Sequence, residues 1–278
     1  MNTSPTSSSR SSSTRPEVNY KTAEEIAIMR EAGRIVAKAL QAAREAIRPG
    51  ISTAELNTIV DTILRDHGAT PCFLGYAPGD HPPFPATITA CINEELVHGI
   101  PSPDRLLKEG DIIGIDTACF FKGYVGDAAF TMAVGEVSSA VQRLLQVTEE
   151  TLHEAIALCR PGNRVSDIAR MTQKYAGKHG YSVAIEYTGH GVGTRMHEPP
   201  QVPNWWPRKI KRNQRGPVDY ELRPGMTFAI EPMLIMGRNE LIEKPDGWTV
   251  VTKDGSWNAH TEHTVAITEG DPLILTLP

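Results

Sequence analysis

The chain repeats a stretch of its own sequence at an offset of 112 residues, and this repeat constrains the fold to two related halves. Arg48-Pro49-Gly50, followed by Ser52, Glu55 and His67-Gly68, recurs as Arg160-Pro161-Gly162, followed by Ser166, Asp167 and His179-Gly180. In each copy we expect Pro-Gly to end one helix, serine to begin the next and glycine to close it, because these residues favour those positions. Two long copies argue against a solenoid.

A second part of the repeat carries acidic residues. The run from Lys108 to Asp116 parallels the run from Arg223 to Glu231 at an offset of 115. Asp127 and Glu262 each precede a short run of apolar and β-branched residues, at 130–134 and 264–267. Each half therefore supplies two carboxylates, as expected for a metal site near a pseudo-twofold axis between the halves.

Asp116 and Asp127 lie on either side of a predicted hairpin turn at Lys122-Gly123. A single aspartate beside a turn is usually a solvated or capping residue. These two, however, are symmetric about the midpoint between Phe121 and Lys122, which predicts cross-strand neighbours about 5 Å apart at Cβ. Like charges facing each other across a ladder are destabilising, and a bound cation removes that conflict.

The types of the acidic residues and of His190 indicate which metals would suit them. Carboxylates with one imidazole suit Mn, Fe(II), Co or Zn, whereas a thiolate-rich set indicates structural zinc or a cluster. The sequence does not separate the four metals. The formal net charge of −5 is compatible with two divalent ions.

The order of five short phrases resembles that of the type I methionine aminopeptidases, within the pita-bread metallopeptidase family. The phrases are Ile115-Asp116-Thr117, Gly126-Asp127-Ala128, Gly189-His190-Gly191, Ile230-Glu231-Pro232 and Thr261-Glu262-His263. The resemblance runs from about Thr22 to the C-terminus. It implies an α+β pita-bread (creatinase/aminopeptidase) fold, with a pseudo-twofold antiparallel sheet and outer helices. It also implies removal of the initiator Met from nascent proteins whose second residue is small.

The resemblance assigns roles to individual residues. Asp116 would chelate one of two divalent ions, Asp127 and Glu262 would bridge both, and His190 with Glu231 would complete the other site; a metal-bridged hydroxide would then attack the peptide carbonyl. His98 and His197 match positions that contact the substrate backbone, and Glu231 could also relay a proton. We expect the other histidines, including His67, His153, His179 and His260, to be ordinary surface or core residues.

The resemblance also implies an apolar pocket for the first side chain of the substrate. Its expected lining residues are Cys72, Tyr76, Phe84, Thr89, Met196 and Trp248, which together suit a thioether. Each of these types is more often found in a core than in a pocket. The chain departs from the family pattern in two places: Met196 replaces a typical aromatic, and an insertion at 77–83 separates Tyr76 from Phe84.

Length and composition predict one catalytic domain over residues 20–278, preceded by a Ser/Thr-rich disordered tail at 1–19. We expect helices at 22–47, 52–67, 138–159 and 166–179, the first two with capping boxes. The sequence has no apolar run of 18 residues, so it predicts no membrane span. The four cysteines have no paired spacing, so they suggest neither a zinc knuckle nor a disulfide framework and fit a reducing cytosol. We expect a cytoplasmic monomer.

A basic segment from Arg208 to Arg215 stands out on an acidic chain. It is either a solvated loop or a contact to ribosomal RNA, with Trp205 and Trp206 stacking on bases or anchoring the loop. Two rival functions remain: a pita-bread aminopeptidase of other specificity, such as cleavage before proline, and a binding protein that kept the fold without catalysis. The intact set of five metal ligands argues against the second.

Overall fold

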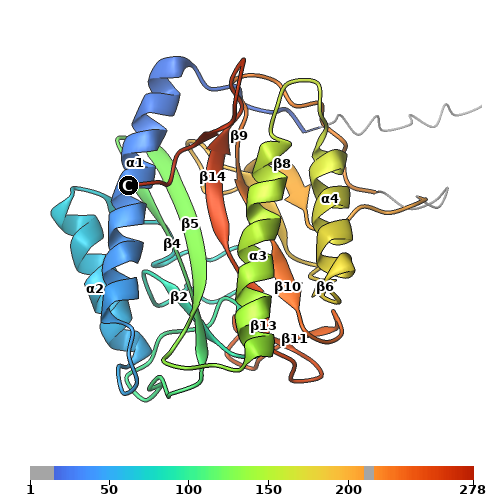
Figure 1. The fold of residues 1–278 in the computed structure, drawn as a ribbon. Helices are drawn as coiled ribbons and strands as arrows, with labels where there is room; N and C mark the ends of the chain where they lie inside the picture. Colours follow the sequence, from blue (N-terminus) through green and yellow to red (C-terminus); the bar gives the residue numbers. More distant parts are fainter. Residues whose placement is uncertain (1–15, 210–215) are drawn as a thin grey trace, which may run out of the picture.

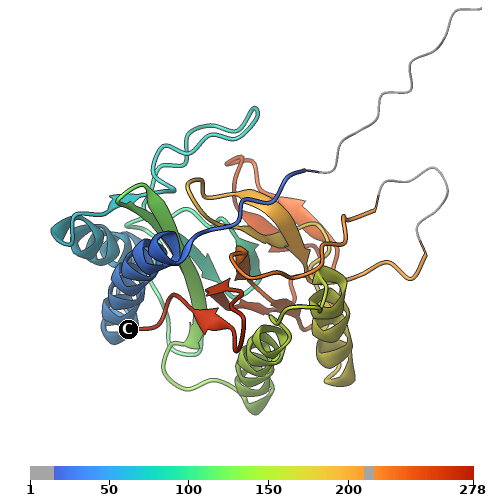
Figure 2. The same cartoon turned by 90° about the horizontal axis from the view of Figure 1, so that it is seen from above.

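The computed structural model of the chain describes residues 16–209 and 216–278. Four helices in this part lie on the same face of the central sheet, as Figures 1 and 2 show. They form two packed pairs, α1 (Ala23–Ala46) with α2 (Thr53–Asp66), and α3 (Ser139–Ala157) with α4 (Val165–Lys178). The four helices that the sequence predicts are confirmed to within two residues at each end.

In the described part of the chain, the central sheet has nine strands, and all of its pairings are antiparallel. Its main path runs β1-β4-β5-β14-β9-β7-β8, with β2 added to β4 and β15 to β14. The strands are β1 (Thr70–Pro71), β2 (Thr89–Ile92), β4 (Ile112–Phe121), β5 (Tyr124–Ala133), β7 (Thr188–Gly191), β8 (Glu198–Pro203), β9 (Thr227–Ile230), β14 (Glu262–Ala266) and β15 (Leu273–Ile274).

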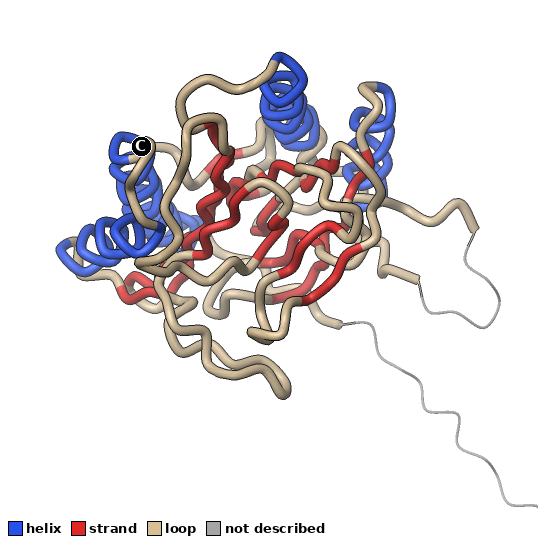
Figure 3. The backbone as a smooth tube through the Cα atoms, turned by 90° about the horizontal axis from the view of Figure 1, so that it is seen from below, coloured by secondary structure: helices blue, strands red, loops and turns tan. Residues whose placement is uncertain are grey.

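Two three-stranded antiparallel sheets lie beside the central sheet (Figure 3). One has the order β13 (Asn258–His260), β10 (Met233–Ile235), β6 (Ser182–Val183). The other has the order β11 (Leu241–Glu243), β12 (Val250–Thr252), β3 (Glu95–Val97). The α+β pita-bread architecture is therefore confirmed.

The predicted repeat is visible in the backbone. An isolated bridge joins Ser52 to Leu106 in the first half, and its counterpart joins Arg164 to Glu221 in the second. The glycines of the two Pro-Gly turns, Gly50 and Gly162, both have a φ of 89°, in the left-handed region that glycine adopts without steric cost. The two halves therefore use the same connection between their helices and the sheet.

The cap of α4 corrects one detail of the repeat. Ser52 caps α2 as expected, in a capping box with Glu55. In the second copy the equivalent N-cap residue is Arg164, and Asp167 accepts a hydrogen bond from its backbone N–H (2.9 Å). Ser166 does not begin the helix; it is buried in the first turn, where its N–H donates to Asp219 (3.0 Å).

Helix α1 packs very closely on strand β5. A Cβ built on Gly126 would lie 2.5 Å from the backbone nitrogen of Gly33, a distance that real side chains do not tolerate. Glycine at position 126 therefore allows the helix to rest directly on the strand. Because Asp127 is the next residue, this contact also positions the part of strand β5 that carries its carboxylate.

The segment before α1 is joined to the sheet. Val18 is buried, and the Lys21 ammonium forms a buried ion pair with Glu198 at 2.7 Å. Val18 of the predicted tail thus packs against the domain, and the Pro16 carbonyl accepts a hydrogen bond from the Tyr220 hydroxyl (2.7 Å), whereas residues 1–15 lie outside the described residues. Within the described ranges, none of the helices has the length and apolarity needed to cross a membrane.

Candidate metal centre

Five strands of the central sheet bring the predicted metal ligands together. Asp116 lies on β4, Asp127 on β5, His190 on β7 and Glu262 on β14, and Glu231 directly follows β9. The His190 Nε2 is 3.7 Å from an Asp127 oxygen and 3.6 Å from a Glu231 oxygen. One ligand atom from each of Asp127, His190 and Glu262 lies within 4.8 Å of the other two. Residues 146 positions apart in the chain thus converge on one point.

The register of the hairpin differs from the prediction. Asp116 pairs with Ala129, and Asp127 pairs with Ala118, because the two-residue turn is Lys122-Gly123 with φ values of 48° and 84°. Two-residue hairpin turns favour positive φ at both positions. The aspartates are therefore diagonal rather than direct cross-strand neighbours. They still share one face of the sheet, since the shift is two residues.

Several polar atoms of this cluster are buried without a hydrogen-bond partner in the described structure. They are Asp116 Oδ1, Asp127 Oδ1, Glu262 Oε1 and His260 Nε2. Buried polar atoms in native proteins nearly always have partners, and an unpaired buried carboxylate is costly. Oxygen and imidazole nitrogen atoms left open in this way fit a bound divalent cation.

The electrostatics of the cluster support the same interpretation. Burial, and then repulsion from Asp127, raises the pKa of Asp116 well above its ordinary value. Burial and the neighbouring carboxylates also raise the pKa values of Glu231 and Glu262, and burial raises the pKa of Asp127 to about 7. Burial lowers the pKa of His190 to about 3, so its ring is neutral and able to bind a metal. A cation would favour the charged carboxylates.

His260 belongs to this cluster, although the sequence predicts an ordinary histidine. Its Nε2 lies 3.7 Å from a Glu231 oxygen and 3.9 Å from a Glu262 oxygen. Burial lowers its pKa to about 3. The available signal was its spacing of two residues from Glu262, since such residues point to the same face of an extended chain.

A cavity of about 720 Å³ opens beside the cluster, and both predicted substrate-contacting histidines line it. His98 directly follows β3 with a φ of 60°, a conformation that is uncommon outside glycine. His197 directly precedes β8; its Nδ1 is 3.1 Å from the Tyr76 hydroxyl, and its ring is 4.2 Å from that of His190. Burial lowers the pKa of His98 to about 4 and also lowers that of His197.

Five of the six predicted pocket residues line this cavity: Tyr76, Phe84, Thr89, Met196 and Trp248. Cys72 is the exception. It packs in a buried cluster with Met196 and Ala118, and burial raises the pKa of its thiol. This cluster includes Met196, which lines the cavity, so the place of Cys72 in the pocket stays a prediction. Sequence reasoning missed the lining residues His81, Val97, Tyr187 and Met233.

A cluster of buried carboxylates and imidazoles on a pseudo-twofold antiparallel sheet defines a metal-dependent hydrolase of the pita-bread class. The chain belongs to metallopeptidase family M24, whose family model matches residues 27–269.

Within this family the chain is similar to methionine aminopeptidases. It is 44% identical over 253 residues to that of Aquifex aeolicus, covering 91% of this chain and 96% of the relative. It is 46% identical over 256 residues to methionine aminopeptidase 1 of Bacillus subtilis, covering 92% and 98%. The crystal structure of the Thermotoga maritima methionine aminopeptidase matches with a TM-score of 0.87 at 39% identity, covering 94% and 100%.

Proposed function

We infer that this chain is a metal-dependent methionyl aminopeptidase that removes the N-terminal Met from nascent proteins whose second residue is small. The observation that carries the inference is the convergence of buried carboxylate oxygens, without hydrogen-bond partners among the described residues, beside a cavity partly lined by apolar and aromatic side chains. The similarity to methionine aminopeptidases over nearly the whole chain supports the same activity. We propose a cytoplasmic monomer; the four cysteines, all buried and unpaired, fit a reducing compartment.

We propose that two ions bind, drawn from Co, Mn, Fe(II) or Zn. Asp116 would hold one, His190 and Glu231 the other, and Asp127 with Glu262 would bridge them. Divalent ions at such a site lower the pKa of bound water and stabilise negative charge on a substrate oxygen. The uncharged state of His190 suits it to this set.

His98 and His197 would position the scissile peptide. Both line the cavity beside the carboxylates, and the lowered pKa of each leaves its ring neutral near pH 7. A neutral imidazole donates from one nitrogen and accepts at the other, so these rings can hydrogen-bond an amide or a carbonyl. Glu231, whose pKa burial raises, could hold a proton between the attacking and leaving groups.

A panel of three peptides tests the specificity. With metal added, we expect release of Met from Met-Ala-Ser and little release of Ala from Ala-Pro, whereas Met-Pro combines an N-terminal Met with a small second residue and is compared with both. Cleavage of Ala-Pro instead would favour the rival specificity, which the fold permits: the prolidase from Pyrococcus furiosus matches with a TM-score of 0.71 at 25% identity. No release from any peptide would favour a binding protein.

We also propose that the basic segment docks on the ribosome. Arg208 and Lys209 are exposed, whereas residues 210–215 lie outside the described residues. The Trp205 indole donates to the Ile185 carbonyl (3.1 Å), and the Arg170 guanidinium lies 5.8 Å from the Trp206 ring. These contacts support anchoring of the segment by its tryptophans, with the exposed side chains of Arg208 and Lys209 available to phosphates.

Alanine substitutions test this docking. Replacing Arg208, Lys209, Lys211 and Arg212 together should weaken ribosome co-sedimentation at low salt and leave cleavage of free Met-Ala-Ser near normal. The control replaces four exposed basic residues of α1 and α4, Arg30, Arg34, Lys174 and Lys178, and should bind as the unsubstituted chain does. Equal binding by both variants would remove the segment as a docking site.

A further inference from the structure

The insertion at 77–83 forms a loop that projects from the body of the protein, as Figures 2 and 3 show. Its base is closed by two backbone hydrogen bonds of 2.8 Å, from Phe84 N–H to the Tyr76 carbonyl and from Gly75 N–H to the Phe84 carbonyl. The two ends of the insertion therefore stay together, and both are attached to residues that line the cavity. Pro78 and His81 of the loop line the cavity themselves.

The tip of this loop contacts the turn at 244–249, which carries Trp248. The His81 Nδ1–H donates to the Gly247 carbonyl (2.8 Å), and the His81 ring centre is 5.0 Å from that of Trp248. The Trp248 indole N–H in turn donates to the Pro82 carbonyl (2.9 Å). Two hydrogen bonds in opposite directions and one ring contact thus join the loop to the turn.

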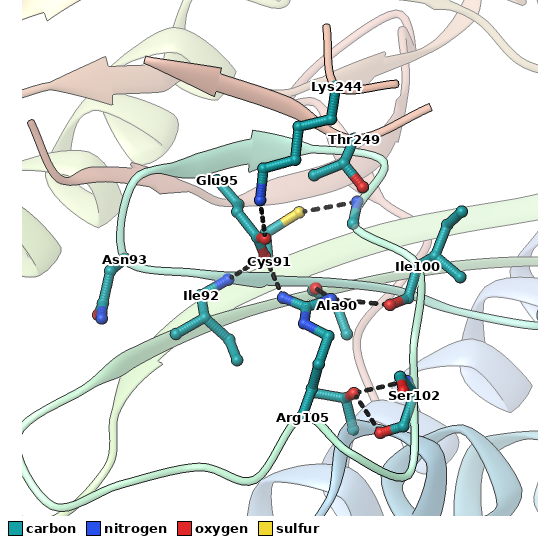
Figure 4. A network of polar contacts seen from close by, with 12 residues as sticks. Ala90, Cys91, Ile92, Asn93, Glu95, Ile100, Ser102, Arg105, Lys244 and Thr249 are labelled. Carbon is teal, nitrogen blue, oxygen red and sulfur yellow. Dashed lines mark hydrogen bonds and ion pairs between the residues drawn. The ribbon is translucent and has the colours of Figure 1, made fainter. Parts of the chain in front are cut away.

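The backbone of the turn is held from the opposite side by other residues. Lys244 forms an ion pair with the buried Glu95 (2.9 Å), which also pairs with Arg105 (Figure 4). Within the turn, Asp246 accepts hydrogen bonds from the Trp248 and Thr249 N–H groups (2.9 and 2.8 Å). The contacts of Lys244 and Asp246 hold the backbone of the turn. The hydrogen bond to the Trp248 indole, by contrast, comes from the 77–83 loop.

Trp248 forms part of the wall of the substrate cavity. Its ring lies 5.1 Å from Phe84 and 5.9 Å from His98, edge to face in both cases. The side chain is buried, at 6% exposure, although Pro82 and His81 beside it are exposed. The position of the indole therefore sets the width of the cavity between Phe84 and His98, the histidine that we propose to contact the substrate.

We propose that the 77–83 loop is a specificity element that holds Trp248 against the cavity, with His81 as its specificity-determining contact. The restrained indole favours an unbranched, flexible apolar first side chain and excludes bulkier branched ones. This inference rests on the proposed aminopeptidase activity. The insertion contributes no predicted metal ligand, but through Trp248 it contributes to substrate specificity.

Three variants in the loop test the proposal. His81→Ala removes the ring contact and the hydrogen bond, and His81→Asn keeps a donor for the Gly247 carbonyl. Asp80→Ala is the matched control, since Asp80 is an exposed neighbour in the same loop that does not line the cavity. Kinetics are measured with metal added, on Met-Ala-Ser and Leu-Ala-Ser, and amide hydrogen exchange of the 244–249 turn is measured in the same proteins.

For His81→Ala we expect a KM for Met-Ala-Ser raised about three- to tenfold with kcat near normal, the range that an aromatic contact of this kind contributes. The preference for Met over Leu in kcat/KM should fall by a similar factor, and the turn should exchange faster. The KM and the preference of His81→Asn should lie between those of His81→Ala and those of the unsubstituted chain. Asp80→Ala should match the unsubstituted chain. A general loss of folding would instead lower kcat on both peptides.

The proposal is overturned if His81→Ala keeps both the KM and the preference for Met, or if the turn exchanges at the unsubstituted rate. Failure of the proposed function has a different signature, because the unsubstituted chain would then release neither Met nor Leu. In that case hydrogen exchange alone decides whether the loop restrains the turn: faster exchange in His81→Ala supports the restraint, and unchanged exchange rejects it.

Discussion

At the scale of single residues, the proposed metal centre consists of buried polar groups, several of which have atoms without a hydrogen-bond partner among the described residues. Asp127 shows this most clearly, because it is buried, one of its oxygens has no partner among the described residues, and its pKa is raised to about 7. His98 differs in kind: it lines the cavity beside the cluster and lies outside the predicted ligand set. The two side chains should therefore respond differently to substitution.

Asp127→Asn should abolish activity and binding of the second ion, because it removes the charge that would bridge both. His98→Ala should keep the full metal content and lower kcat by about 10²-fold or more, as loss of a positioned catalytic hydrogen bond does. Metal analysis and steady-state kinetics on the same preparations separate the two roles. An Asp127→Asn enzyme with two tightly bound ions and a near-normal rate would contradict the bridging assignment.

The sequence predicted which acidic residues converge better than it predicted their surroundings. Residues such as Asp116 and Glu231 are marked by a repeat and by strand-like neighbours, so their convergence follows from topology. His260 was missed because its one signal, the spacing of two residues from Glu262, is weak until strand β13 places its ring beside two glutamates. Cys72 was assigned to the pocket by the resemblance to the family, and whether its side chain faces the cavity depends on the pairing of β1 with β4, which the sequence alone does not show.

At the scale of elements, the close packing of α1 on β5 connects the helical layer to the metal site. Gly126→Ala would place a methyl group 2.5 Å from a backbone atom of α1, so that the backbone of α1 or β5 would have to shift at a cost in stability. We expect a loss of about 1–3 kcal/mol, the usual cost of overpacking. For a chain of this size the thermal midpoint should fall by roughly 2–4 °C per kcal/mol.

Gly177→Ala is the matched control for this substitution. Gly177 lies in α4 with open space where its Cβ would be, so alanine there should be neutral or stabilise by up to about 1 kcal/mol. Thermal melts of the two variants side by side provide the comparison. A Gly126→Ala protein as stable as the Gly177→Ala protein would show that α1 does not rest on β5 as closely as described.

Helices were the most predictable elements, because capping boxes such as Ser52 with Glu55 are local signals, although the N-cap of α4 is Arg164 and not the expected Ser166. The hairpin register was predicted from the symmetric spacing of the two aspartates and is wrong by two residues. The Lys122-Gly123 turn, which the sequence also predicted, sets the observed register, and the shift of two leaves both side chains on the same face. Local sequence signals could not predict the path of the 77–83 loop, because that path depends on a long-range contact between His81 and Gly247.

At the scale of the whole molecule, the buried carboxylates should make the stability of the metal-free protein depend on pH. A carboxyl whose folded pKa is raised loses stability as pH rises from its unfolded pKa toward its folded pKa. Buried histidines such as His190 and His260 act in the opposite direction, but only up to their ordinary pKa of 6.5. Above that pH the carboxylates dominate, and metal binding offsets their repulsion.

We therefore expect the metal-free protein to melt at a lower temperature at about pH 8 than at about pH 6.5. Added divalent metal should raise the thermal midpoint by more at the higher pH, because fewer protons must then be displaced from the ligands. Scanning calorimetry at the two pH values, with and without metal, checks this. A metal-induced increase that is equal at both pH values, or larger at the lower one, would argue against carboxylates as the principal ligands.

The central claim is that one cluster on the sheet binds divalent ions and that peptide cleavage depends on them. Its most direct test is a titration of the metal-free enzyme, verified by elemental analysis, with Mn or Co while release of Met from Met-Ala-Ser is followed. The account predicts no release without metal, a rise with added metal, and saturation near two bound ions per chain. Release at the full rate from enzyme shown to contain no metal would contradict it.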